Sequence, residues 1–517
     1  MKEISHILLF IIAIRAANSD TGLRTQQGII YGRQTEASIE YLGIQYAKVI
    51  RWKPPIDVAS EKFANGSYHA VSFGPCCLQP KTPDYIPNQN EECLYLNIYK
   101  PIIPSNSSLL PVLVWIHGGA HNHGCSSEAI PLIFNGTNII AYSPSGQPVI
   151  VVTINYRLGV LADMFLNELV EEDPQWSTAD ANSVTIFGQS AGGLSVTDLG
   201  AVKGSSGLYR TAISESGLGS PGTSSSYYNI SFALNASNSV VQRLHCDYEG
   251  RRRLLTCIRN ASFDDLLRTY DSRYTRPIIE NYFFPLYPLL AISSGQYNNV
   301  SLIMGNNDYE QPICFEHPLM TSSEALTKIA ATFSPERSPM IADYYHLHNC
   351  SMRPTANATR CCDIVRRILM DSIFDCDIRR LFNAFYAKYG AQYEQNKLFS
   401  YHLNCYPLCP IVQQEGICRH SSEIPFVFGT VSDVDSQEQF HCTWNNQTRF
   451  FSNNIISHWI SIAQTGRPLH TWPSYDPLVP KYFHVTPDQG FLPTDWNRNC
   501  SIFDKIEAER ARELFQF

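Results

Sequence analysis

Residues 183–193, which read SVTIFGQSAGG, join a short strand-like run to a glycine-rich turn. The run SVTIF at 183–187 is rich in β-branched and apolar residues and predicts a buried strand. Glycines at positions 188 and 192 permit a tight turn from that strand into a helix. A turn of this kind pushes the side chain of Ser190 out at the end of the sheet. The stretch therefore predicts a strand–turn–helix unit.

Three further apolar runs predict buried strands elsewhere in the chain. They are 110–116 (LPVLVWI), 149–154 (VIVVTI) and 301–304 (SLIM). Continuous apolar runs suit parallel strands that are covered on both faces. The amphipathic pattern FFSNNIISHWISIAQ at 450–464 predicts a helix. Strands interleaved with helices indicate an α/β fold with a large, mostly parallel, twisted sheet flanked by helices.

The composition is that of a globular protein. The 517 residues are 44% hydrophobic and 17% charged, which is enough apolar material for a sizeable core. The net charge is −8, and the densest basic run, three arginines at 251–253, is too short to form a binding stripe. We therefore expect no nucleic-acid partner. We find no repeat or low-complexity linker, so residues 20–517 are expected to form a single domain.

The N-terminus has the pattern of a secretory signal over residues 1–19. Lys2 precedes a short apolar run at 7–14, and small residues follow it. The run is too short to cross a bilayer, so cleavage is favoured over a membrane span, and no other stretch predicts a span.

Sixteen cysteines and many Asn-x-Ser/Thr sequons agree with an oxidising compartment. The sequons begin at Asn65, Asn106, Asn135, Asn229, Asn235, Asn260, Asn299, Asn349, Asn357, Asn446 and Asn499. With the signal, they predict a secreted, extracellular glycoprotein.

The turn at 188–192 (GQSAG) fits the nucleophile elbow of hydrolases, in which Ser190 attacks and the N–H of Ala191 faces the developing oxyanion. An ordinary glycine-rich turn is the alternative. A second glycine loop, HGGA at 117–120, follows the run at 110–116 and would supply further N–H donors. A serine nucleophile also needs a base and an acid. Fifteen histidines compete for the role of base, and the residues alone do not choose among them.

Four blocks of sequence carry a family resemblance that runs from about Gly28 to Cys500. They are YLGIQYA at 41–47, ECLYLN at 92–97, NYRLG at 155–159 and WPSY at 472–475. On these blocks the chain resembles the type-B carboxylesterase/lipase family, which includes the cholinesterases. The resemblance implies an α/β-hydrolase fold, hydrolysis of small-molecule carboxylic esters, and no metal or cofactor.

The resemblance also implies the other catalytic residues. The run GNNDYE at 305–310 is similar to the family's acid block and makes Glu310 the acid. Asp308 is the second candidate for the acid, but its position in the run does not match that of the acid in the family's block. The run HSSEIPFVFG at 420–429 is similar to the family's histidine block and makes His420 the base. The alternatives are a solvated carboxylate for Glu310 and a packed polar residue for His420. The implied oxyanion loop and donors are Gly118, Gly119, Ala120 and Ala191.

Three disulfides follow from the same resemblance. They are Cys77–Cys93, Cys246–Cys257 and Cys376–Cys500. The other ten cysteines cannot be paired from the sequence.

Several positions depart from the family's pattern. The interval 155–190 is short, so a helix expected there is reduced or lost, which would expose apolar sheet surface. The segment before Arg51 is also shorter than the corresponding segment of the family. Ala120 stands where the family has a third glycine, and a positive φ there would cost energy. Gln189 stands where the family has Glu, and Gln311 where it has Gly.

The substrate expected is a neutral ester. The loop between Cys77 and Cys93 contains no Trp and only Tyr85 as a candidate to hold a cation, so a quaternary ammonium ester is disfavoured. Two other functions stay open: a cholinesterase-like adhesion or binding protein that no longer catalyses, and a structural secreted glycoprotein. The intact set Ser190, Glu310 and His420 favours an active enzyme.

Overall fold

A computed structural model gives the structure of the chain. It describes residues 21–80, 86, 88–102, 109–128, 132–170, 184–217, 227–247, 250–271, 275–280, 283–355, 358–390, 397–405, 418–431, 445–469, 472–487, 490–496 and 500–515. The expected signal at residues 1–19 and Tyr85 lie outside these ranges. None of the helices within them is long and apolar enough to cross a membrane.

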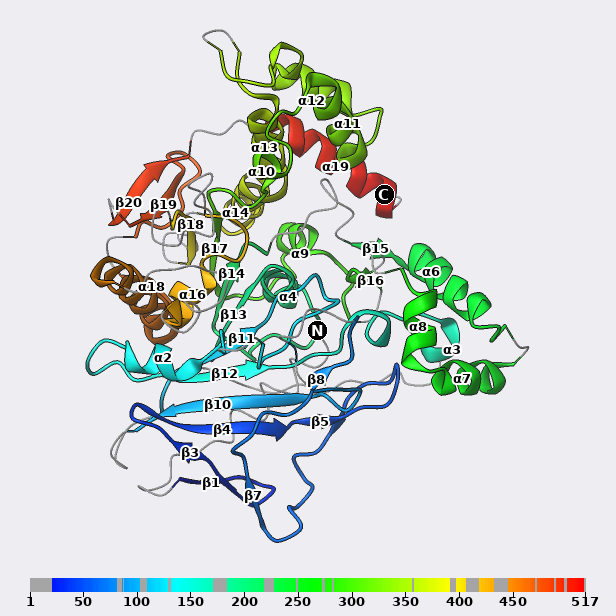
Figure 1. Ribbon diagram of the computed structural model, residues 1–517, viewed down its shortest axis with the longest axis vertical. Coiled ribbons are helices and arrows are strands. Elements are labelled where there is room, and N and C mark those ends of the chain that lie inside the picture. The colour runs from blue at the N-terminus through cyan, green and yellow to red at the C-terminus, as the bar shows by residue number, and fades with distance from the viewer. Residues whose placement is uncertain are drawn as a thin grey trace.

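An eleven-stranded sheet forms the centre of the molecule (Figure 1). Its strands, in spatial order, are β20 (Gly490–Asp495), β19 (Lys481–Thr486), β18 (Leu398–Leu403), β17 (Ser301–Asn307), β14 (Thr211–Glu215), β13 (Val184–Gln189), β11 (Val112–Ile116), β12 (Ile150–Ile154), β10 (Tyr95–Pro101), β4 (Ser38–Gln45) and β3 (Arg33–Gln34). All neighbours from β12 to β19 are parallel, and the pairs at both edges are antiparallel. The mostly parallel, twisted sheet predicted from the sequence is confirmed, with all four predicted strands in its parallel part.

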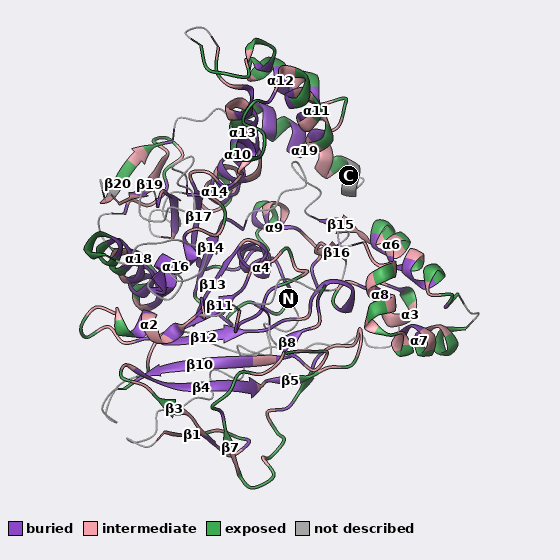
Figure 2. Cartoon of the chain, viewed as in Figure 1, coloured by how far each residue is buried: buried purple, intermediate pink, exposed green. Residues whose placement is uncertain are grey.

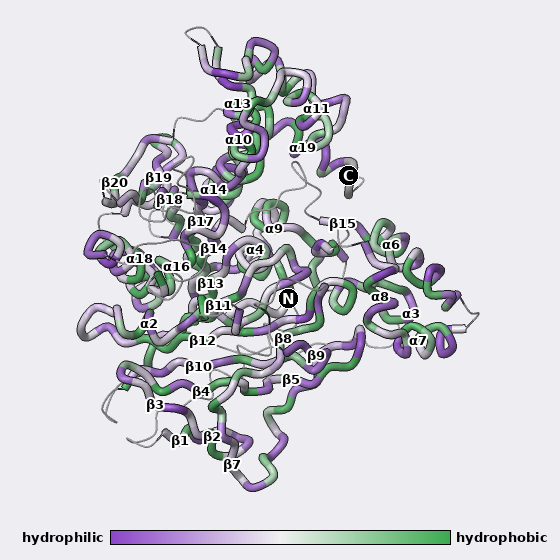
Figure 3. Tube along the Cα trace, viewed as in Figure 1, coloured by the Kyte–Doolittle hydropathy of each residue, from purple (hydrophilic) through white to green (hydrophobic). Residues whose placement is uncertain are grey.

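Alternate residues of the central strands enter two separate cores. In β11, Val112, Val114 and Ile116 pack into one core, and Leu113 and Trp115 pack into the other. This alternation follows from the two-residue period of a strand, and burial of both faces explains why the run is apolar throughout. Figures 2 and 3 show these strands as the buried, hydrophobic centre of the fold.

Helices cover both faces of the sheet. The first core includes residues of α4 (Ala191–Leu199), α9 (Pro288–Ser294) and α14 (Cys376–Tyr389). The second includes α2 (Gly136–Ala141), α16 (Ile424–Phe428) and α18 (Asn446–Thr465). The helix predicted at 450–464 is thus confirmed as α18, which lies against the sheet.

Two groups of helices extend from the sheet (Figure 1). One has its own core and contains α10 (Ile313–Glu316), α11 (Ser322–Phe333), α12 (Ser338–Tyr344), α13 (Cys361–Met370) and α19 (Ser501–Phe515). The other contains α6 (Ile230–Arg243), α7 (Arg251–Asn260) and α8 (Phe263–Thr269).

The shortened interval at 155–190 contains only a small α-helix in its described part. Between β12 and β13 the described residues form only a 3-10 turn at Gly159–Leu161 and α3 (Asn167–Val170). Residues 171–183 lie outside the described ranges. Every residue of β13 is nevertheless buried, so this strand does not have the exposed apolar surface that the short interval led us to expect.

Candidate active site

Ser190 lies in a strained turn between β13 and α4. Its backbone dihedrals are φ 56° and ψ −123°, a conformation that side-chain-bearing residues rarely adopt. The N–H of Ser190 donates to the carbonyl oxygen of Glu215 at 2.8 Å, which ties the turn to β14. The hydroxyl therefore lies at the carboxyl end of the parallel strands, at the first turn of a helix, as the sequence predicts.

The glycines on either side of Ser190 are required by space. A Cβ atom on Gly192 would lie 2.0 Å from the carbonyl oxygen of Ile116, and one on Gly188 would lie 2.7 Å from the carbonyl carbon of Gly192. The turn thus packs backbone against backbone at the end of β11. Only glycine leaves room for this approach.

Glu310 and His420 come together from segments that are 110 residues apart. Glu310 follows β17, and His420 lies two residues after Cys418, which a disulfide joins to Cys405 just after the end of β18. A β-bridge joins Tyr309 to Arg419. It places the side chains of the next residues, Glu310 and His420, beside each other. Nδ1 of His420 lies 2.5 Å from Oε2 of Glu310.

The carboxylate of Glu310 is buried and held by two more donors. Its Oε1 accepts a hydrogen bond from the hydroxyl of Ser216 and one from the backbone N–H of Asn307, both at 2.6 Å. The side-chain amide of Asn307 also donates to Glu423, three residues after His420. We did not single out Ser216, Asn307 or Glu423 as site residues from the sequence, because no spacing rule links them to the triad.

The hydrogen bond with Glu310 fixes the state of the His420 imidazole. Because a carboxylate only accepts, Nδ1 carries a proton, and in the neutral ring Nε2 therefore has the free lone pair. Burial lowers the pKa of His420, but the charge and hydrogen bond of Glu310 together with the charge of Glu423 raise it more, so the pKa lies above the usual 6.5. The imidazole is 37% exposed. A reactant could therefore reach Nε2.

The structure does not join Ser190 to His420 directly. Within the described part of the chain, no hydrogen bond links the Ser190 hydroxyl to the imidazole. The side-chain nitrogen of Gln189 lies instead 3.3 Å from Nε2 of His420. The sequence identified Gln189 as an unusual residue, but it gave no sign of this contact.

The expected oxyanion donors lie on two segments, with Gly119 and Ala120 on the loop after β11 and Ala191 at the start of α4. A Cβ atom on Gly118 would lie 3.1 Å from the Cβ of Ser190, so this loop passes close to the serine. No described residue accepts a hydrogen bond from the N–H groups of Gly119, Ala120 or Ala191. That of Ala191 is unbonded because it begins α4. These groups are therefore available to an anionic oxygen.

His121 holds the candidate oxyanion loop against α4. Its Nε2 lies 3.1 Å from the carbonyl oxygen of Ala191 and 3.1 Å from the hydroxyl of Ser195. Burial lowers the pKa of His121 to about 3, so the ring is neutral at physiological pH. No motif in the sequence distinguishes His121 from the other histidines.

Ala120 has the strain expected from the sequence. Its φ is 51°, in the left-handed region that favours glycine. We predict that Ala120→Gly raises the free energy of unfolding by up to about 1 kcal/mol, because relief of strain exceeds the added entropy of the unfolded chain. Urea denaturation measures this. The control Ala261→Gly changes a residue at φ −60° and should lower stability. A loss of stability in Ala120→Gly would contradict the prediction.

Asp308, the second candidate acid, faces away from His420. Its Oδ2 accepts from Nε2 of His484 at 3.0 Å, and its Oδ1 lies 3.9 Å from Nδ1 of His402. Glu310 is thus the carboxylate that contacts the candidate base.

The structure contains the three disulfides that the resemblance implies. They are Cys77–Cys93, Cys246–Cys257 and Cys376–Cys500. Four others were not paired from the sequence: Cys76–Cys125, Cys314–Cys362, Cys350–Cys361 and Cys405–Cys418. Cys409 and Cys442 lie outside the described residues.

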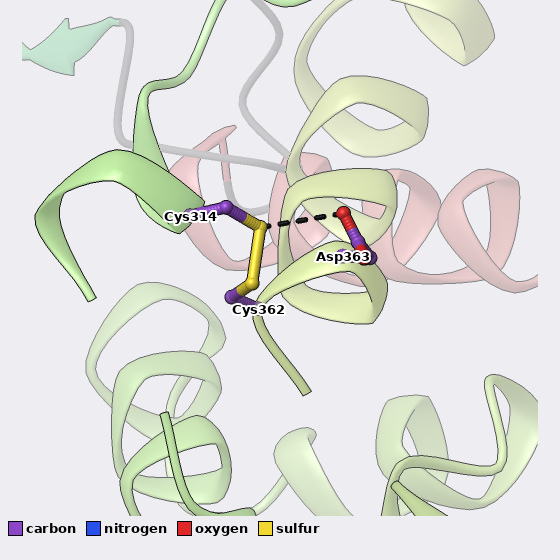
Figure 4. A group of neighbouring side chains, drawn as sticks. All are labelled: Cys314, Cys362 and Asp363. Atoms are coloured by element: carbon purple, nitrogen blue, oxygen red, sulfur yellow. Dashed lines mark hydrogen bonds between the residues drawn. A yellow bond between two sulfur atoms is a disulfide. The ribbon is translucent and has the colours of Figure 1, made fainter. Parts of the chain in front are cut away.

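One cluster in the described ranges has metal-ligating residue types (Figure 4). It consists of Cys314, Cys362 and Asp363, and the sulfur of Cys314 lies 3.3 Å from Oδ1 of Asp363. The two cysteines form a disulfide, so neither offers a thiolate. The carboxylate is paired with Arg360 at 2.8 Å. The cluster is therefore structural.

A cavity of about 180 Å³ lies next to Asn122, two residues after the candidate oxyanion loop. Its walls include Leu78, Leu158, Val160, Phe263 and Leu267. Asn122 lines it too, and its side-chain amide donates to the carbonyl oxygen of Ala120 at 3.2 Å. This mainly apolar space is thus linked to Ala120 through Asn122, and its lining includes neither Ser190 nor an expected oxyanion donor.

Comparison with known proteins places the chain in a family. The model of the carboxylesterase family matches residues 19–171 and 178–501, and it breaks within the shortened interval. Para-nitrobenzyl esterase of Bacillus subtilis (strain 168) is 27% identical, over 87% of this chain and 92% of that protein. Carboxylesterase 5A of Canis lupus familiaris is 28% identical, over 88% of this chain and 82% of that protein.

Solved structures have the same fold. A structure of PNB esterase aligns with a TM-score of 0.72 at 23% identity, over 96% of this chain and 100% of that one. At this identity the likeness concerns the fold alone. Together with the family match, it leads to one conclusion: the chain belongs to the carboxylesterase family and has the α/β-hydrolase fold.

Proposed function

We propose that this protein is a serine hydrolase that cleaves carboxylic esters through an acyl-enzyme on Ser190. The observation that carries the proposal is the buried Glu310 carboxylate 2.5 Å from Nδ1 of His420, in a site whose strained turn presents Ser190. Family membership supports ester hydrolysis, since the relatives compared above are named esterases or carboxylesterases.

The proposed reaction begins with proton transfer to His420. Nε2 of His420 takes the proton of the Ser190 hydroxyl while the serine oxygen bonds to the ester carbonyl carbon. Glu310 keeps the imidazole oriented and stabilises its cation. As the tetrahedral intermediate collapses, the imidazolium gives the proton to the leaving alcohol. Water then attacks the acyl-enzyme by the same route, which releases the acid and restores the serine.

Backbone N–H groups stabilise the negative charge that develops on the carbonyl oxygen. In this proposal Gly119, Ala120 and Ala191 donate to it, and Gly118 leaves room for the substrate beside Ser190. Donors fixed in place before the reaction need no rearrangement, and removal of one such donor typically costs about 2.7–4 kcal/mol of transition-state stabilisation. His121 and Asn122 hold this loop in the required conformation.

A small neutral ester is the proposed substrate class. Gln189 places an amide, not a carboxylate, beside the imidazole, so this position offers no charge to attract a cation. The cavity lined by Asn122 has mainly apolar walls, which suit an uncharged alkyl or aryl group.

We also propose that the protein is secreted as a glycoprotein. Seven disulfides among the described residues support an oxidising compartment. Among the sequon asparagines in the described ranges, six are exposed, at positions 65, 235, 260, 299, 349 and 446. Expression in a eukaryotic cell should place the protein in the medium, and glycosidase treatment should lower its apparent mass. Retention inside the cell without glycan would contradict this proposal.

Hydrolysis of p-nitrophenyl acetate and butyrate by the purified, disulfide-bonded protein tests the enzymatic proposal. We expect turnover well above the buffer rate with at least one of them. A cholinesterase-like adhesion or binding protein that has lost catalysis is the alternative. A folded protein that leaves both esters intact would favour that alternative and contradict the proposed function.

A further inference from the structure

The side chain of Gln189 occupies a space between the candidate oxyanion loop and the candidate base. Gln189 is the last residue of β13 and pairs with Glu215 of β14. It is only 2% exposed. A Cβ atom on Gly118 would lie 2.8 Å from its Oε1, so the amide lies directly beneath the loop that faces Ser190.

The amide nitrogen of Gln189 has one partner in the described part of the chain, the imidazole of His420. The distance from Nε2 of Gln189 to Nε2 of His420 is 3.3 Å, within the range of a hydrogen bond. Because Nδ1 of His420 carries its proton toward Glu310, Nε2 is the acceptor and Gln189 is the donor.

We propose that Gln189 is a positioning residue that stabilises the neutral imidazole of His420 by donating a hydrogen bond to Nε2. This inference rests on the proposed function of the site and deepens it. An amide donor favours the state with a free lone pair on Nε2, which is the state a general base requires. A carboxylate at position 189 would do the opposite, since it accepts from Nε2–H and favours the imidazolium.

Proton transfer from Ser190 requires this hydrogen bond to open. The Oγ–H bond breaks and an Nε2–H bond forms, so Nε2 can no longer accept from the amide. Rotation of the Gln189 side-chain amide can then turn Oε1 toward the new Nε2–H. A side chain that both donates and accepts therefore suits both states of the base, whereas a carboxylate suits only the charged one.

The remaining charges around His420 come from two carboxyl groups. Glu310 follows β17 and Glu423 begins α16, and both raise the pKa of His420 against the effect of burial. Burial and the nearby Glu310 also raise the pKa of Glu423 itself, which favours its neutral form. Glu215, on β14, is directed to the indole N–H of Trp459 at 2.7 Å. A carboxylate at position 189 would add to the two that act on His420.

The substitution Gln189→Glu tests the inference through the titration of His420. An opposite charge this close typically raises a histidine pKa by about one unit or more. We expect the acid limb of the kcat/KM profile for p-nitrophenyl acetate to move up in pH by about one unit. Gln189→Met has a similar length but no donor, so it should shift the limb in the same direction by less. Gln296→Glu adds the same charge on the exposed chain after α9 and should leave the profile unchanged.

NMR titration of isotope-labelled histidine measures the same pKa without any need for activity. His420→Asn identifies the signal. A shift of that signal in both position-189 variants, even with no esterase activity, would support the role of Gln189 and contradict only the proposed function. An active protein whose His420 titrates identically in wild type, Gln189→Glu and Gln189→Met would contradict the role of Gln189 and leave the proposed function intact.

Discussion

Ser190→Ala is expected to lower kcat/KM for p-nitrophenyl butyrate by a factor of roughly 10⁴ to 10⁶. Loss of the nucleophile removes the covalent route altogether, and only substrate binding and the oxyanion donors remain to accelerate hydrolysis by water. The substitution deletes one oxygen from a half-buried side chain that makes no described hydrogen bond to its neighbours, so the fold should persist.

The control for this prediction is Ser293→Ala. Ser293 is exposed on α9, and among the described residues its hydroxyl bonds only to the carbonyl oxygen of Leu289, at 2.8 Å. It should retain full activity. Equal rates in the parent and in Ser190→Ala would show that another group performs the hydrolysis.

Gly192→Ala is expected to prevent the protein from folding. The new Cβ would lie 2.0 Å from the carbonyl oxygen of Ile116 and 2.7 Å from that of His117. Both atoms belong to the backbone at the end of β11, in the middle of the sheet, so neither can rotate away. We expect a loss of more than about 3 kcal/mol in the free energy of unfolding, the large end of the range for overpacked cores.

The yield of secreted, disulfide-bonded protein measures this effect. Gly22→Ala is the matched control, because its Cβ would meet only the side chains of Tyr31 and Ile29, at 3.2 and 3.3 Å. These side chains can move by a few tenths of an ångström. A normal yield and normal unfolding for Gly192→Ala would mean that the elbow does not pack against β11 as described.

Local chemistry allowed much of the fold to be predicted from the sequence. The strand–turn–helix unit around Ser190 was predictable because the spacing of its glycines reflects contacts within a few residues. Buried parallel strands such as β11 were predictable because both of their faces are apolar. The antiparallel edge strands, by contrast, are short or half-polar, and their place in the sheet depends on pairing over long distances.

The candidate base and acid could not be chosen from local patterns. Fifteen histidines are equivalent to a reader of the sequence, and family resemblance was needed to select His420. The contacts that hold this residue near Glu310 come from the bridge between Tyr309 and Arg419 and from the Cys405–Cys418 disulfide. Neither contact has a sequence signature, since each joins segments that meet only in the folded chain.

The approach of Gln189 to His420 was unpredictable for the same reason. A substitution beside the nucleophile is visible in the sequence, but the partner of its amide is 231 residues away. Only the folded structure shows that the side chain at position 189 contacts the candidate base.

Mass spectrometry of the wild-type protein, acid-quenched during turnover of p-nitrophenyl butyrate, tests the central claim most directly. We predict one butyryl group on the peptide that contains Ser190, formed together with a burst of one p-nitrophenol per active protein molecule. Hydrolysis with no acyl group on Ser190 at any quench time, or an acyl group on a different residue, would contradict the proposed mechanism.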